Sequence, residues 1–168
     1  MRAHVIENGI ISNTIEVESL SVIPGLVAAV GNESVGWRYD GNTFSAPAAD
    51  PTALRTAHWE EIKRERDRRT QQGGYQVAGK WFHSDTFSRT QQMGLVMMGA
   101  SIPADLQWKT MDGSFVAMTQ ALAGQVFAAA AASDAALFAR AEQIKAAMEV
   151  DPVNFNLASQ TWPAVFGE

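Results

Sequence analysis

The chain contains no cysteine, and this absence excludes several kinds of chemistry. None of its 168 residues is a cysteine. Disulfide bonds, a catalytic thiol and cysteine-ligated zinc are therefore ruled out. The lack of cysteine also fits a protein that folds in a reducing cytoplasm.

Positive charge and long apolar runs are also scarce. The formal net charge is −5 and the sequence pI is about 5.2. Nucleic-acid binding needs a basic surface, so we expect no nucleic-acid partner. The chain has no run of 18 apolar residues, and its N-terminus lacks the basic-then-hydrophobic pattern of a signal peptide. We therefore expect a protein that stays out of membranes and folds in the cytoplasm where it is made.

Motifs for cofactors and metals are missing as well. No glycine-rich phosphate-binding pattern follows a predicted strand. The three histidines, His4, His58 and His83, lie in three different predicted elements without the spacing of a metal site. We expect no cofactor and no metal.

What the chain does contain is the composition of a globular protein. Hydrophobic residues make up 46% and charged residues 18%, which is enough apolar surface for a core. The length fits one domain, or one domain with a small appendage. The residue pattern changes near residue 47, so we predict an α+β protein. A small antiparallel β module covers residues 1–46, a linker covers 47–50, and a mainly helical domain with two short β-hairpins covers 51–168.

Turn signals organise the predicted β module. Strands at 3–7 and 10–17 flank Asn8-Gly9, a strong hairpin signal because both turn positions need positive φ. A second hairpin is predicted over 36–44, around an Asp-Gly pair. The apolar stretch at 26–30 could form a short helix, so the module should be a four-stranded antiparallel sheet.

The first predicted helix runs from Pro51 to about residue 72. Asp50 supplies an N-cap before the proline, and Gly73-Gly74 ends the helix. Two hairpins are predicted further along the chain, at 75–82 and 106–118, each around a turn that contains glycine.

Two more helices are predicted from their caps and periodicity. One starts after Ser84 or Asp85 and runs to about residue 99, and its apolar second half should be buried. The longest helix is capped by Thr119 and runs to about residue 149 with a 3.6-residue apolar period. Ser133-Asp134 could divide it into two, because both residues prefer caps to helix interiors.

The tripeptide His83-Ser84-Asp85 contains the residue types of a hydrolytic triad. Neighbours in sequence usually point apart, so a helix N-cap is the favoured interpretation. A cell-wall or polysaccharide hydrolase is kept as the lesser alternative, and it would need carboxylates that converge from separate elements. The candidates are Glu60, Glu61, Asp85, Asp105 and Asp112. We expect no enzymatic activity.

The charged run at 60–69 and the aromatic residues point instead to protein contacts. The run holds five cations and four anions. Its field is nearly cancelled, so a solvated helix face or a protein interface is favoured over phosphate binding. Aromatic side chains anchor interfaces as readily as they fill cores. The candidate interface residues are Trp37, Tyr39, Phe44, Arg66, Arg69, Trp81, Phe82 and Trp108.

Five short blocks of the sequence carry a resemblance to a known family. They are WEEIKRERDRR (59–69), GG (73–74), KWFHSDTFSR (80–89), WKTMDG (108–113) and WP (162–163). In residues and spacing they resemble a phage and prophage family defined by a domain of unknown function, number 4376, over roughly residues 55–165. Residues 36–47 look like the short β modules of tail-fibre and fibre-assembly proteins. The family has no assigned reaction, so the resemblance implies no catalytic residues.

The resemblance implies a setting among tail genes and leads to a functional hypothesis. We expect a virion component of a bacteriophage tail that links a tail fibre or receptor-binding protein to the baseplate or tail tip by protein–protein contacts. A tail-fibre assembly chaperone that is not retained in the virion is the alternative. The partners would be other tail proteins, and several copies, for example a trimer, would match tail symmetry.

Overall fold

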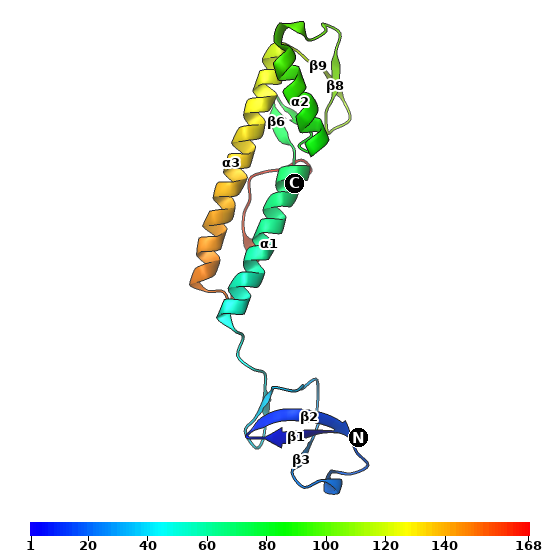
Figure 1. Cartoon of the computed structure of the whole chain (residues 1–168), viewed down its shortest axis with the longest axis vertical. Coiled ribbons are helices and arrows are strands. Elements are labelled where there is room, and N and C mark those ends of the chain that lie inside the picture. The colour runs from blue at the N-terminus through cyan, green and yellow to red at the C-terminus, as the bar shows by residue number, and fades with distance from the viewer. The chain divides into compact units, whose positions relative to one another are not determined.

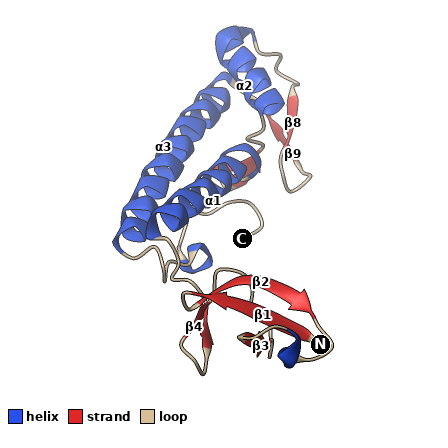
Figure 2. Ribbon diagram, turned by 60° about the horizontal axis from the view of Figure 1, so that its bottom comes forward, coloured by secondary structure: helices blue, strands red, loops and turns tan.

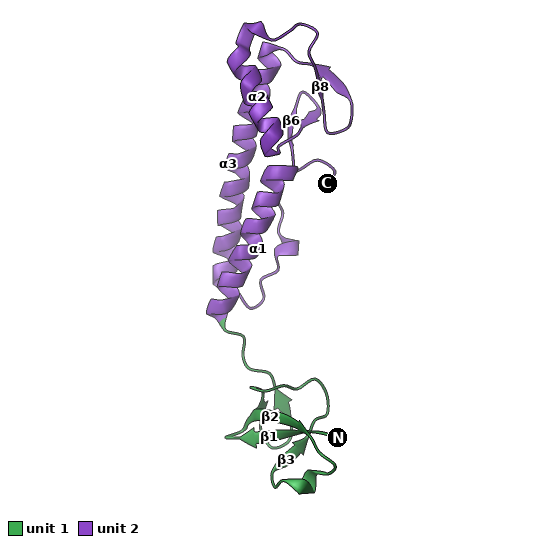
Figure 3. Ribbon diagram, turned by 45° about the vertical axis from the view of Figure 1, so that its right-hand side comes forward, with its two compact units in different colours: residues 1–50 green, residues 51–168 purple.

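The computed structural model describes residues 1–168, which form two compact units, Met1–Asp50 and Pro51–Glu168 (Figure 3). The first unit is an antiparallel sheet, and the second consists of helices with two small hairpins. The predicted α+β class is therefore confirmed.

The sheet of the first unit has five strands in the order β3-β1-β2-β4-β5 (Figure 2). Their bounds are Arg2–Glu7 (β1), Ile10–Glu16 (β2), Leu26–Ala28 (β3), Arg38–Tyr39 (β4) and Phe44–Ser45 (β5). The β1–β2 turn at Asn8-Gly9 has φ values of 51° and 73°. Both values are positive, as the hairpin prediction required.

Two predictions for this unit were wrong. The stretch expected as a short helix is strand β3, and it pairs with β1 through Ala3↔Ala28 and His4↔Val27. A short apolar run does not distinguish helix from strand, and here the free edge of β1 decides the outcome. The sheet therefore has five strands and not four. The only helical turn before the linker is a 3₁₀ helix at Leu20–Val22.

The second unit is built around two long helices, which lie side by side in Figure 1. Helix α1 spans Pro51–Gln72, α2 spans Thr86–Met98 and α3 spans Gln120–Val150. The hairpins are β6–β7 (Tyr75–Val77 and Lys80–Phe82) and β8–β9 (Gln107–Lys109 and Phe115–Ala117). Short 3₁₀ helices occur at Gly99–Ser101 and Leu157–Ser159.

Helix α3 contributes residues to two separate clusters of buried side chains. The hairpin cluster joins α2, α3 and the two hairpins, and consists of Tyr75, Phe82, Leu95, Met118, Ala123, Val126 and Ala130. The α1–α3 cluster consists of Ile62, Ala141, Ile144 and Met148, covered by Trp59, Phe155, Leu157 and Trp162. Length and composition alone would allow α3 to cross a membrane, but the core helices of soluble proteins meet the same criterion.

The Gly73-Gly74 pair that ends α1 is required by close packing. A Cβ on Gly73 would lie 2.4 Å from the Arg69 carbonyl oxygen, and one on Gly74 would lie 2.3 Å from the Met111 sulfur. Gly74 also has a φ of +70°, which favours glycine. The two glycines therefore let the chain turn from α1 into β6 against the β8–β9 turn.

Two expectations for the later helices were also wrong. The second half of α2 is largely exposed, with Met97 at 82% and Met93 at 48%, while only Leu95 is buried there. Helix α3 is continuous through Ser133-Asp134. The Asp134 carboxylate accepts two hydrogen bonds from Arg89, at 2.6 and 2.9 Å, so a tertiary ion pair replaces the local capping role that the sequence suggested.

Candidate peptide-binding groove

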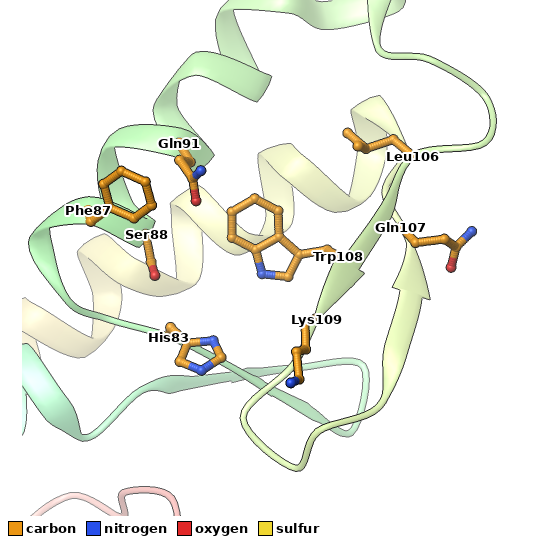
Figure 4. Close-up of a pocket in the computed structure, with 8 residues that line it drawn as sticks. All are labelled: His83, Phe87, Ser88, Gln91, Leu106, Gln107, Trp108 and Lys109. Atoms are coloured by element: carbon orange, nitrogen blue, oxygen red, sulfur yellow. The ribbon is translucent and has the colours of Figure 1, made fainter.

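A groove separates helix α2 from strand β8. One cavity of about 420 Å³ lies at the start of α2 (Figure 4), and a second of about 460 Å³ continues along the helix. The two share Gln91, Leu106 and Trp108. We call them together the α2–β8 groove, lined by His83, Phe87, Ser88, Gln91, Gly94, Leu95, Met98, Leu106, Gln107, Trp108 and Lys109.

The α2 wall is fixed at its N-terminus by a network of hydrogen bonds. Asp85 is the N-cap, and its carboxylate accepts the Ser88 N–H at 3.0 Å and the Ser88 hydroxyl at 2.6 Å. These bonds hold the pKa of Asp85 below its usual 3.8. Ser84 is buried and accepts the Gly74 N–H at 2.9 Å. The favoured interpretation of the His-Ser-Asp tripeptide, a helix N-cap, is confirmed.

The β8 wall is fixed by the turn that follows it. Asp112 accepts hydrogen bonds from Thr110, Ser114 and the Lys80 ammonium, at 2.6 to 3.0 Å. The Lys80 contact is the main reason that the pKa of Asp112 lies far below its usual range. The Met111 N–H donates to the Trp81 carbonyl at 2.9 Å. The β8–β9 hairpin is thereby tied to β7, so both walls of the groove are anchored.

The outer edge of β8 is unpaired. Thr110 donates to the Ser114 carbonyl and Met118 donates to the Leu106 carbonyl, with Trp108 opposite Val116 in the register between them. Because hydrogen-bonded pairs alternate in an antiparallel ladder, the N–H and C=O groups of Gln107 and Lys109 point away from β9. They make no other backbone hydrogen bond. Figure 4 shows this strand on the α2 side of its partner, so the free edge borders the groove.

Several polar side chains of the groove also lack a partner within the chain. The His83 ring, the Gln91 and Gln107 amides and the Lys109 ammonium make no hydrogen bond or ion pair, which is ordinary for groups in contact with water. The Trp108 Nε1 atom is different, because it is buried and has no acceptor. In Figure 4 it faces the side of the cavity where Ser88 and His83 lie. A buried unsatisfied donor costs about 1–3 kcal/mol.

The predicted interface residues do not converge, and only Trp108 lines the groove. Phe82 is fully buried in the hairpin cluster. Arg69 is also buried, and its guanidinium donates to Glu65, Glu168 and the Pro163 carbonyl. Neither position offers a surface to a partner, which does not fit the expected role, because both side chains are used by the fold itself.

The other candidate residues are partly exposed. Arg66 lies 4.3 Å from the centroid of the Phe138 ring, and Trp81 packs edge-on against Phe166. In the first unit Trp37 is partly buried, and Tyr39 and Phe44 stack with their centroids 4.7 Å apart. Tyr39 and Phe44 line a hollow of about 380 Å³ on that unit.

The candidate hydrolase carboxylates come from different elements, and most have structural partners. Glu60 and Glu61 lie on α1, bonded to Lys63 and His58. Asp85 caps α2, and Asp112 holds the β8–β9 turn. No three His, Asp or Glu side chains form a group that could hold a metal ion.

A family model covers most of the second unit, including the whole groove. The model described as Domain of unknown function (DUF4376) matches residues 53–160. The chain belongs to this family. No curated protein and no solved structure matches the chain. The residues of the α2–β8 groove, from His83 to Lys109, all lie within the matched range.

Sequence reasoning missed most of the groove. Trp108 was selected for its aromatic ring, whereas His83, Gln91, Gln107 and Lys109 were not selected as partner-binding residues. The available signal was the short strand beside the predicted turn at 111–113, which made a two-stranded hairpin with open edges. Which edge faces α2 depends on tertiary packing, and no local pattern encodes it.

Proposed function

We propose that the chain is a protein-binding adaptor that holds an extended segment of another protein in the α2–β8 groove. In the setting we propose, a bacteriophage tail, it links a tail fibre or receptor-binding protein to the baseplate or tail tip. The observation that carries this proposal is the unpaired edge of β8 at Gln107 and Lys109, bordering a groove with anchored walls.

An open strand edge beside a groove is suited to binding a polypeptide. An extended segment can add to the edge as a further strand, about 4.8 Å from β8, and satisfy the free N–H and C=O groups. The apolar lining at Leu95, Met98 and Leu106 can accept alternate side chains of that segment. Backbone pairing then supplies affinity, while the lining supplies selectivity.

An adaptor needs a second contact surface, and the first unit supplies a candidate. Its hollow of about 380 Å³ is lined by Tyr39 and Phe44 together with Val27 and Val30. Val30 is 83% exposed and Phe44 is half-buried. Aromatic and aliphatic side chains that remain partly exposed are typical anchors of protein interfaces. The two units would then hold two partners, or two parts of one partner.

The test is to locate the protein in purified phage particles and to cross-link it there. A photoreactive residue at Gln107 should cross-link to another tail protein, whereas the same residue at the exposed Ala147 of α3 should not. Mass spectrometry of the particles reads both outcomes. Particles that contain the protein but give no cross-link at Gln107 would overturn the role of the groove.

Absence from mature particles would contradict the adaptor role and favour the assembly chaperone. Co-expression distinguishes the two, because a chaperone raises the yield of soluble fibre and a structural link does not. Self-association, for example as a trimer, is a separate part of the proposal. Size-exclusion chromatography with light scattering of the full chain measures it directly.

A further inference from the structure

We infer that the segment held in the α2–β8 groove is an extended peptide that pairs with β8 and carries an aspartate or glutamate at the Lys109 end and apolar side chains toward Met98. This inference rests on the proposed function and adds the chemistry of the partner. The groove has a polar end at His83 and Lys109, where the Lys109 ammonium carries a positive charge, and an apolar end at Leu95 and Met98.

The charge at the polar end selects an acidic group. Lys109 has no ion-pair partner: of the two carboxylates nearest to it in sequence, Asp112 is engaged by Lys80, and Asp105 forms no ion pair with it. An incoming carboxylate would form a charge-assisted hydrogen bond there, which is stronger than a neutral one.

An acidic side chain fits this end better than a chain terminus. A terminal carboxylate is usually captured by a nest of successive backbone N–H groups, and the polar end offers side-chain donors instead. Lys109 and His83 are side-chain groups on separate elements, β8 and the segment before α2. They can reach a carboxylate that projects sideways from an extended chain.

The apolar end is open enough to take side chains of the segment. Nothing lies within 4 Å of the position that a Cβ on Gly94 would occupy, so the α2 wall is recessed there. Leu106, directly before β8, and Trp108 on β8 are two residues apart and therefore face the same side. Side chains at alternate positions of an added strand would follow the same spacing.

The buried indole N–H of Trp108 supplies a further site for an acceptor. It is covered in the free protein, so a carbonyl or carboxylate of the segment reaches it only after a neighbouring side chain moves aside. The unbonded Gln91 amide and Phe87, which is 71% exposed, line the same cavity. Binding should therefore change the fluorescence of Trp108.

The experiment selects binders for the full-length protein from a library of random peptides, each about eight residues long and flanked by a carrier. The expected result is enrichment of peptides with one acidic residue and apolar residues at alternate positions. Enrichment of basic or uncharged peptides, or of none, would overturn the inference. Affinities of the selected peptides are then measured by tryptophan fluorescence and calorimetry.

Chemical variants of a selected peptide test the pairing and the charge. Replacing its acidic residue by the corresponding amide should weaken binding about tenfold, while amidating its C-terminus should have no effect. In an added strand every second residue points its N–H toward β8. N-methylation of those amides should abolish binding, whereas N-methylation of the intervening amides should not. A loss of binding on amidation of the C-terminus alone, or equal effects of both N-methylation registers, would contradict the proposal.

Substitutions in the protein test the same contacts as the peptide variants. Lys109→Gln should lower the affinity for the selected peptide about tenfold. Lys145→Gln, on α3 outside the groove, should leave this affinity unchanged. Gln107→Pro removes the outward N–H of the β8 edge but no hydrogen bond to β9, whereas Gln107→Ala keeps that N–H. Only the proline variant should lose binding. If it does not fold, the N-methylated peptides still decide the question.

The outcomes separate this inference from the proposed function. Cross-linking at Gln107 in particles, combined with selection of basic peptides, would leave the adaptor role standing and reject the acidic partner. Failure of both the cross-link and the selection would reject the groove as a binding site.

Discussion

The two faces of helix α2 differ in how their polar groups are satisfied. On the inner face Arg89 donates to Asp134, to the Ser84 carbonyl at 2.6 Å and to the Thr70 carbonyl at 3.0 Å. The buried Gln92 accepts the Tyr75 hydroxyl and donates to the His83 carbonyl at 3.0 Å. On the groove face, Gln91 has no partner and the Trp108 indole N–H across from it has no acceptor.

This difference separates polar groups that hold the fold from groups that remain available. Buried polar groups in folded proteins are nearly always hydrogen-bonded, so each exception calls for an explanation. The inner face follows this rule through α2 and α3, and on α1 it does so at the Thr70 carbonyl but not at the Thr70 hydroxyl, which is buried without a partner. The groove face departs from it where the β8 edge is also unpaired, and a partner molecule would satisfy both.

Substitution of Arg89 should have the largest effect on stability. Arg89→Met removes four hydrogen bonds and leaves Asp134 without its partner. The two side chains are 27% and 33% exposed, so we expect a loss of about 2–3 kcal/mol rather than the larger cost of a fully buried pair. Urea unfolding measures it. Lys145→Met, which removes a single ion pair to the exposed Glu149 and a cation–π contact to Trp59, is the control and should cost less than about 1 kcal/mol.

If Arg89→Met and Lys145→Met had the same small effect, the inner face would not be more tightly held than the surface. The comparison between the two faces would then fail. Arg89→Lys should recover only part of the loss, because an ammonium cannot reproduce the bidentate contact to Asp134.

Two aromatic substitutions compare the faces directly. Tyr75→Phe removes the hydroxyl that donates to Gln92 and leaves a buried acceptor unsatisfied, so it should cost about 1–2 kcal/mol. Trp108→Phe removes a donor that has no acceptor. Removal of that unsatisfied donor should offset the loss of buried apolar area. The free energy of unfolding of Trp108→Phe should therefore stay within about 0.5 kcal/mol of that of the unsubstituted protein. Thermal and urea unfolding of both variants provide the measurement, and a cost for Trp108→Phe as large as that for Tyr75→Phe would contradict the expected difference between the faces.

The N-cap of α2 should produce a small effect that depends on pH. Hydrogen bonds from Ser88 lower the pKa of Asp85 below 3.8, so its charge stabilises the folded state above about pH 4. That contribution is lost as the pH falls through the lower pKa of the folded protein. Asp85→Asn keeps the cap acceptor but removes the charge. Because the side chain is exposed, we expect a cost of only about 0.5 kcal/mol at pH 6 and none near pH 2.

Urea unfolding of the native chain and of Asp85→Asn between pH 2 and pH 7 gives this difference. A difference that stays constant over the whole range would mean that the carboxylate charge does not act at the cap.

Features encoded by a few neighbouring residues could be predicted from the sequence. The positive-φ turn at Asn8-Gly9, the Asp85 cap and the limits of α1 all depend on local backbone preferences. The strand at 26–28 could not be predicted in this way, because its pairing with β1 joins segments more than twenty residues apart. The exposure of Met93 and Met97 was missed for a related reason, since composition does not reveal which face of a helix finds a neighbour.

The candidate site was predicted only in part. The importance of Trp108 could be inferred from its residue type, and the surrounding hairpin from its turn signal. Arg69 and Phe82 were chosen by the same criteria, yet the fold uses both internally. Residue type alone cannot tell an anchor for a partner from an anchor for the core.

The two hydrophobic clusters share helix α3 but no side chain, and this has a consequence for local unfolding. The hairpin cluster ends at Ala130 and the α1–α3 cluster begins at Ala141. We therefore expect the groove end to open and close as a cooperative unit of its own while the other end stays protected. A peptide seated against β8 should slow amide hydrogen exchange in β8 and α2 and leave the exchange around Ile144 and Met148 unchanged.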